Sequence, residues 1–168
     1  MNRHHLIGLV ASIAAIAVLT GASQAAAHPP CERIDATISD KVVDEGCPPP
    51  TQVCVIGTVR GKQGFNGTTV FVLGSRGEAP PTAPDQRPVT GTITYTFSDG
   101  STLTARETSI GNVNPSTGTG HAGGTQEVTS GTGRYAGASG FAYLAQHFED
   151  DHFVTEIQGE VCVAATQG

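Results

Sequence analysis

Apolar and polar residues alternate along most of the chain, and this pattern predicts antiparallel β-strands joined by turns. The clearest segment is 90–110, where Ile93, Tyr95 and Phe97 share one face and threonines occupy the other. Alternation with a period of two is typical of half-buried strands. No segment after residue 27 has a convincing helical period. Seven or eight strands over about 110 residues predict a closed, all-β, antiparallel barrel, with a two-sheet sandwich as the alternative.

The turn at 98–100 decides which side chains share a face in the clearest hairpin. A two-residue Asp-Gly turn would place the two apolar sets on opposite sides. A three-residue loop with Gly100 in the left-handed conformation pairs Tyr95 with Leu103 and keeps both sets on one face. We expect the second register, which places Glu107 on the inner face.

Three segments are expected along the chain. Residues 1–27 have a basic start, an apolar run and a terminal Ala-Ala-Ala, which together predict a cleaved secretory signal peptide; an uncleaved membrane anchor is the alternative. Residues 28–50 carry few periodic apolar positions and end in three prolines, so they are expected to form a disulfide-tethered N-terminal arm. Residues 51–168 form the predicted barrel domain. The processed protein is then secreted or periplasmic, without a membrane anchor.

Four cysteines lie beyond the predicted signal peptide, at Cys31, Cys47, Cys54 and Cys162. An even number in an exported chain favours two disulfides, which can pair in three ways. We favour Cys31–Cys47, closing the arm, and Cys54–Cys162, joining the first and last strands. Their spacing matches no zinc motif, and no metal is expected.

Composition and charge narrow the classes of function. The 22 glycines and 10 prolines suit many short strands joined by turns. The formal net charge is -6 and the nine basic residues are scattered, so no nucleic-acid partner is expected. No G-x-S-x-G or H-E-x-x-H motif supports a hydrolase. The G-x-G-x-x-G match at 118–123 lacks the βαβ setting of a dinucleotide site.

Residues 131–140, with the sequence GTGRYAGASG, resemble the G-T-G-x-[YF]-x-G-A-x-G turn of dirigent-like and allene oxide cyclase-like barrels. A T-x-x-Y-x-F-x-D-G-S-x-L hairpin precedes this turn, and a terminal hairpin with a G-E-V strand follows it, so the resemblance covers roughly 53–163. It implies an eight-stranded barrel with a mostly apolar cavity that acts without a cofactor. Plant members steer phenoxy-radical coupling or cyclise an oxylipin epoxide. Related barrels are often dimers or trimers, which implies a homodimer or trimer here.

Glu107 is the candidate catalytic residue, because it continues an apolar strand face. A carboxyl in such a place can have a raised pKa and act as a general acid or base. The alternative is a solvated position at the rim, paired with Arg60 or Arg134.

The candidate ligand-binding residues are other side chains on apolar strand faces. Tyr95 and Tyr143 could stack on a ligand or hydrogen-bond to it, and His147 shares the alternation of Tyr143. Phe97 and Leu103 complete the set. The alternative is that the tyrosines belong to the core and His147 to the rim.

These observations predict an exported barrel that binds a small hydrophobic or phenolic molecule in its central cavity. If it is an enzyme, it is a cofactor-independent cyclase or isomerase; the sequence leaves catalysis open. The alternative is a non-catalytic extracellular structural or interaction barrel whose core is filled by its own side chains.

Overall fold

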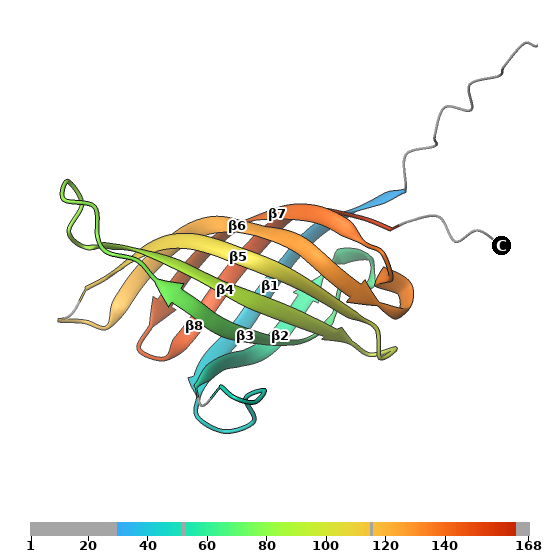
Figure 1. Cartoon of the computed structure of the whole chain (residues 1–168), viewed down its shortest axis with the longest axis horizontal. Helices are drawn as coiled ribbons and strands as arrows, with labels where there is room; N and C mark the ends of the chain where they lie inside the picture. Colours follow the sequence, from blue (N-terminus) through green and yellow to red (C-terminus); the bar gives the residue numbers. More distant parts are fainter. Residues whose placement is uncertain (1–29, 52, 115, 164–168) are drawn as a thin grey trace, which may run out of the picture.

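Eight antiparallel strands close into a barrel, which confirms the predicted fold class (Figure 1). The computed structural model describes residues 30–51, 53–114 and 116–163. Each strand pairs with the next, and β1 pairs with β8, so the sheet has no free edge. The strands are β1 (Cys31–Val43), β2 (Cys54–Gly61), β3 (Gly67–Arg76), β4 (Gln86–Phe97), β5 (Thr102–Val113), β6 (Thr119–Thr132), β7 (Ser139–Glu149) and β8 (His152–Cys162).

The first strand lies in the segment that was expected to be an arm. Ile34, Ala36 and Ile38 face the interior and are buried, because they alternate with outward-facing polar residues. The strand pairs with β8 from Cys31 to Lys41. The N-terminal segment is therefore tethered by a disulfide as expected, but residues 31–43 form part of the barrel wall rather than an arm.

The disulfides join Cys31 to Cys162 and Cys47 to Cys54, so the favoured pairing is wrong. Because β1 belongs to the barrel, Cys31 lies directly opposite Cys162 on β8. Cys47 lies in the loop between β1 and β2, close to the start of β2 at Cys54. Two disulfides indicate an oxidising, non-cytoplasmic environment.

The predicted hairpin register is confirmed. Tyr95 pairs with Leu103, and the Phe97 amide donates a 3.0 Å hydrogen bond to the Ser101 carbonyl oxygen. Gly100 has a φ of 79°, the left-handed conformation that glycine adopts without steric cost. This register turns Glu107 toward the barrel interior.

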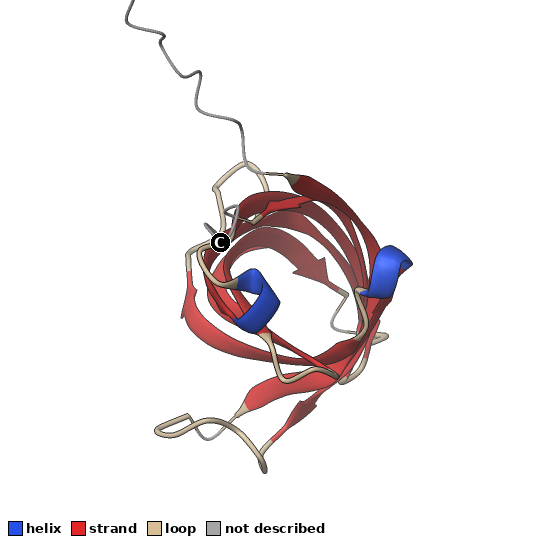
Figure 2. Ribbon diagram, turned by 90° about the vertical axis from the view of Figure 1, so that its right-hand side faces the viewer, coloured by secondary structure: helices blue, strands red, loops and turns tan. Residues whose placement is uncertain are grey.

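One end of the barrel is filled by aromatic side chains, and we call it the closed end. Two 3-10 turns, η1 (Lys62–Gly64) and η2 (Gly133–Tyr135), lie at this end, which faces the viewer in Figure 2. Phe65 lies 5.1 Å from Phe97 and 5.4 Å from Tyr95, measured between ring centroids, and Tyr135 lies 4.8 Å from Phe97. This cluster packs the closed end without a large void.

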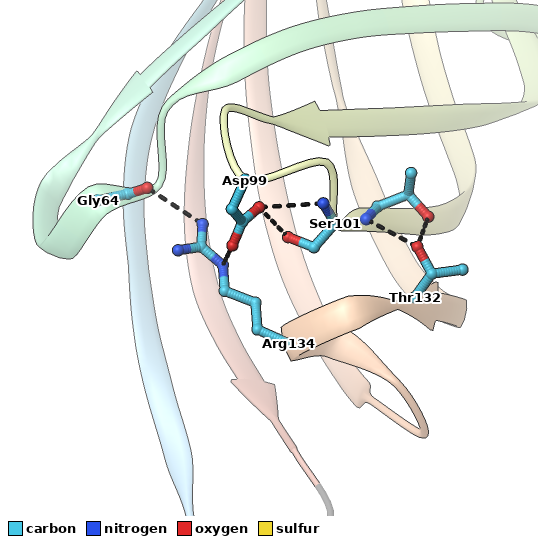
Figure 3. A network of polar contacts seen from close by, with 6 residues as sticks. Gly64, Asp99, Ser101, Thr132 and Arg134 are labelled. Atoms are coloured by element: carbon cyan, nitrogen blue, oxygen red, sulfur yellow. Dashed lines mark hydrogen bonds and ion pairs between the residues drawn. The ribbon is translucent and has the colours of Figure 1, made fainter.

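Arg134 contacts several turns at the closed end of the barrel (Figure 3). Its guanidinium lies 4.8 Å above the Phe97 ring, a cation–π distance, and 3.6 Å from the Asp99 carboxylate. It also donates a 3.3 Å hydrogen bond to the Gly64 carbonyl oxygen. One side chain thus connects the β4–β5 turn, η1 and η2.

The two disulfides should contribute unequally to stability. Cys31–Cys162 spans 131 positions of sequence and Cys47–Cys54 spans 7. Cross-linking the longer loop removes more entropy from the unfolded chain, which predicts losses of about 5 and about 2 kcal/mol when each bond is deleted. Urea unfolding of Cys31→Ala/Cys162→Ala and Cys47→Ala/Cys54→Ala, followed by circular dichroism, measures both values. Equal losses would contradict the prediction.

Candidate functional site

The end of the barrel opposite η1 and η2 opens into a cavity of about 740 Å³, which we call the outer cavity. It lies where the loops between β3 and β4, β5 and β6, and β7 and β8 meet. Val42 and Val113, two of the exposed large apolar side chains, line its mouth. An apolar mouth of this size is typical of small-molecule sites.

The outer cavity exists because small residues occupy the inner face of β5 and β6 in this half. Ser109, Gly111 and Ala122 line it. Farther along β5, toward the closed end, the inner residues are Ala105 and Leu103, both buried in the core. The inner surface therefore changes from packed to hollow along the barrel axis.

A smaller chamber of about 60 Å³ lies below the outer cavity, and we call it the floor chamber. The two spaces adjoin at Glu107, Gln146 and Phe153, which line both. The floor chamber is lined by Ile38, Asp40, Val55, Phe71, Ile93, Glu107, Gln146, Phe153 and Thr155. Its wall is mostly apolar, yet it contains two carboxyl groups.

Asp40 reaches the chamber from β1. Gly57 lies opposite it on β2, and a Cβ there would be 2.3 Å from the Asp40 Cβ, so the glycine makes room for the carboxyl. Burial, and secondly the charge of Glu107, raise the pKa of Asp40 to about 7. Its Oδ1 is buried and has no hydrogen-bond partner within the described part of the chain.

Glu107 reaches the chamber from β5 and is held by a chain of hydrogen bonds. The Tyr95 hydroxyl donates a 2.5 Å hydrogen bond to the Gln126 Oε1, and the Gln126 Nε2 donates one of 2.9 Å to the Glu107 Oε2. Burial raises the pKa of Glu107, and the Gln126 bond offsets part of that rise. Burial also raises the pKa of Tyr95, so its hydroxyl stays protonated and donates.

The arrangement can transfer protons. Two carboxyls in an apolar chamber cannot both ionise readily, because burial and mutual repulsion each favour the protonated form. A carboxyl with a pKa near neutrality can both donate and accept a proton at physiological pH. The pair therefore has the properties of a general acid–base site.

The predicted site residues fall into three groups, and Glu107 alone among them lines the outer cavity or the floor chamber. Tyr95, Phe97 and Leu103 are buried, but they belong to the packed half and line neither space. Tyr95 is linked to the floor chamber only through Gln126. The alternative for Glu107, a solvated rim position paired with Arg60 or Arg134, is not observed.

Tyr143 and His147 lie on the outer surface, so the expectation that they face the interior is wrong. The Tyr143 side chain is 66% exposed and contacts the Phe141 ring at a centroid distance of 5.0 Å. The strand β7 carries apolar residues on both faces, and its inner face consists of Ala142, Leu144, Gln146 and Phe148. The aromatic pair therefore gave no reliable sign of direction.

Asp40, Gln126 and Gln146 were missed by the sequence analysis. For Asp40 a signal was present, because Ile34, Ala36 and Ile38 alternate with polar residues and place Asp40 next on the inner face. Gln126 lies in a strand rich in glycine and threonine that offers no such alternation. Its role follows only from the register with Glu107 on β5.

The fold and the site together define a class of protein. It is a β-barrel whose sheet has no free edge and whose interior opens to solvent at one end, with two carboxyl groups, Asp40 and Glu107, at the base of the cavity; we call these two residues the acid pair. No family model, curated protein or solved structure matches the chain.

Among the residues that the structure describes, no helix has the length and apolar character needed to cross a membrane.

The acid pair predicts that the protein loses stability as the pH rises. The folded protein binds a proton at Asp40 more tightly than the unfolded chain does, because its pKa is about 7 instead of 3.8. The free energy of unfolding should therefore fall between about pH 5 and about pH 8, by about 2 kcal/mol, since partial exposure screens part of the full shift. Asp35 and Asp99 have lowered pKa values, so their protonation changes the free energy of unfolding only at a pH below this window.

Urea unfolding at both pH values measures this loss. Asp40→Asn should remove most of it, whereas Glu156→Gln, which removes a carboxylate from the exposed outer face of β8, should leave it unchanged. A pH dependence that is identical in wild type and Asp40→Asn would contradict the assignment.

Proposed function

We propose that the barrel binds a small hydrophobic molecule in the outer cavity and that Glu107 and Asp40 move a proton to or from it. The reaction class is a cyclisation or isomerisation that needs no cofactor. The observation that carries the proposal is an acid pair with raised pKa values at the base of a cavity open at one end.

The size and lining of the outer cavity support binding. Its volume of about 740 Å³ lies within the range of roughly 300–1,000 Å³ found for small-molecule sites. Val42, Val89, Val113 and Phe148 supply apolar surface near the mouth. The floor chamber then presents the polar groups that would orient a reacting atom.

Three further parts of the proposal come from the sequence. The motif at 131–140 surrounds η2, and the eight-stranded barrel is the fold that the dirigent-like and allene oxide cyclase-like resemblance implies. Export by the signal peptide at 1–27 fits the disulfides, although those residues lie outside the described part of the chain. The homodimer or trimer stays a prediction.

A non-catalytic barrel is the second candidate function. It is favoured by the closed half, where the rings of Phe65, Tyr95, Phe97 and Tyr135 pack against one another in the buried core. The two candidates differ in one measurable property, which is whether the open half admits a small molecule.

Fluorescence of N-phenyl-1-naphthylamine, a neutral aromatic probe, tests this difference. Wild type should enhance the fluorescence saturably. Ser109→Phe should weaken binding roughly tenfold or more, because the ring would occupy the outer cavity that Ser109 lines. The matched control is Thr108→Phe, which places the same ring on the exposed outer face of β5.

Val113→Trp at the mouth provides a second blocking variant should Ser109→Phe fail to fold. Thermal unfolding establishes that each variant is folded. Absence of saturable binding by wild type, or equal weakening by the Ser109 and Thr108 variants, would contradict the proposal and favour the non-catalytic barrel.

A further inference from the structure

The floor chamber contains two carboxyl groups, and among the described residues only Gln126 donates a hydrogen bond to either of them. Asp40 and Glu107 face it from β1 and β5, and none of the nine residues that line it is basic. An ionised carboxylate only accepts hydrogen bonds. The Gln146 amide also lines the chamber, and one of its two N–H groups is taken up by a 2.8 Å hydrogen bond from Nε2 to the Thr155 hydroxyl oxygen.

Two buried polar atoms beside the chamber have no partner within the described part of the chain. They are the Asp40 Oδ1, which lines the chamber, and the hydroxyl of Thr69, which does not line it but lies on β3 two residues from the lining residue Phe71. The barrel register places Gly57 between them, opposite Asp40 on one side and opposite Thr69 on the other. Nearly all buried polar atoms in proteins are hydrogen-bonded. A polar group of a ligand is therefore expected beside Gly57.

The chamber also has the size and the aromatic lining that suit a small cation. Its volume of about 60 Å³ exceeds what a single water needs, roughly 10–15 Å³ on the same measure. Phe71 and Phe153 line it, and aromatic rings attract cations. Above it, the outer cavity provides apolar surface for the remainder of a ligand.

We propose that the ligand is a hydrophobic amine, whose protonated nitrogen enters the floor chamber and donates hydrogen bonds to Asp40 and Glu107. This inference rests on the proposed function, because it names the ligand class of the same cavity. An ammonium group has three donors and no acceptor, and its positive charge favours the ionised form of both carboxyls, which then accept its hydrogen bonds. An alcohol has one donor and no charge, and an anionic ligand would meet no basic group in the chamber.

The rim of the outer cavity carries basic side chains, whereas the floor chamber carries acidic ones. Arg76 and Arg87 line the mouth of the outer cavity and are exposed. The Arg87 guanidinium already donates hydrogen bonds of 2.7 and 3.1 Å to the carbonyl oxygens of Pro84 and Gln86, at the start of β4. An anionic ligand would bind here in the reverse orientation, with its head group in solvent. The desolvated floor chamber discriminates more strongly than this exposed rim, so we favour the cationic ligand.

Competition among three ligands with one alkyl chain tests the inference. Octylammonium, octanol and octanoate are each used to displace N-phenyl-1-naphthylamine from the disulfide-bonded protein. Octylammonium should displace the probe at roughly tenfold lower concentration than octanol, as charge-assisted hydrogen bonds predict. Asp40→Asn and Glu107→Gln should reduce this preference to within about twofold. The exposed Glu156→Gln, with the same change of net charge, should keep it.

The outcomes separate the inference from the proposed function. Binding of the probe with equal or stronger displacement by octanol or octanoate overturns the amine ligand and leaves the cavity proposal standing. An amine preference that survives in both floor-chamber variants also overturns it. Failure of wild type to bind the probe contradicts the proposed function itself.

Discussion

The pairing of β1 with β8 is the constraint on which the rest of the molecule depends. It closes the sheet, and the disulfide between Cys31 and Cys162 covalently joins the two strands where they meet. Closure also brings the acid pair together, because Asp40 and Glu107 come from strands that are four apart in the barrel order. Neither the cavity nor the pair exists in an open sheet.

The two halves of the barrel differ in how their interior is filled. In the closed half the inner side chains are large, and Arg134 fixes the turns around them. In the open half the inner side chains are small, and the carboxyls are held in an apolar setting that disfavours their charged forms. The packed half supplies the stability that allows the other half to hold groups in an unfavourable environment.

Much of the fold could be predicted from local alternation. The register around Gly100 and the inward direction of Glu107 followed from requiring both apolar sets to share a face. The same logic failed for Tyr143, because β7 is apolar on both faces. It was not applied to Ile34–Ile38, where it would have identified β1 and Asp40.

Features set by contacts between distant strands could not be predicted in this way. The pairing of Cys31 with Cys162 depends on the β1–β8 register, which spans nearly the whole described chain. The link from Tyr95 through Gln126 to Glu107 depends on three neighbouring strands and on the orientation of one amide. A single sequence contains no local pattern for either.

That amide has a consequence for where a proton can reside. The Tyr95 hydroxyl donates to Oε1 of Gln126, and the amide NH₂ group donates to Oε2 of Glu107. An oxygen that accepts a hydrogen bond is the poorer place for a proton. The barrel thus makes the two oxygens of one carboxyl chemically different. A proton on Glu107 is therefore favoured on Oε1, which accepts no hydrogen bond from Gln126, over Oε2.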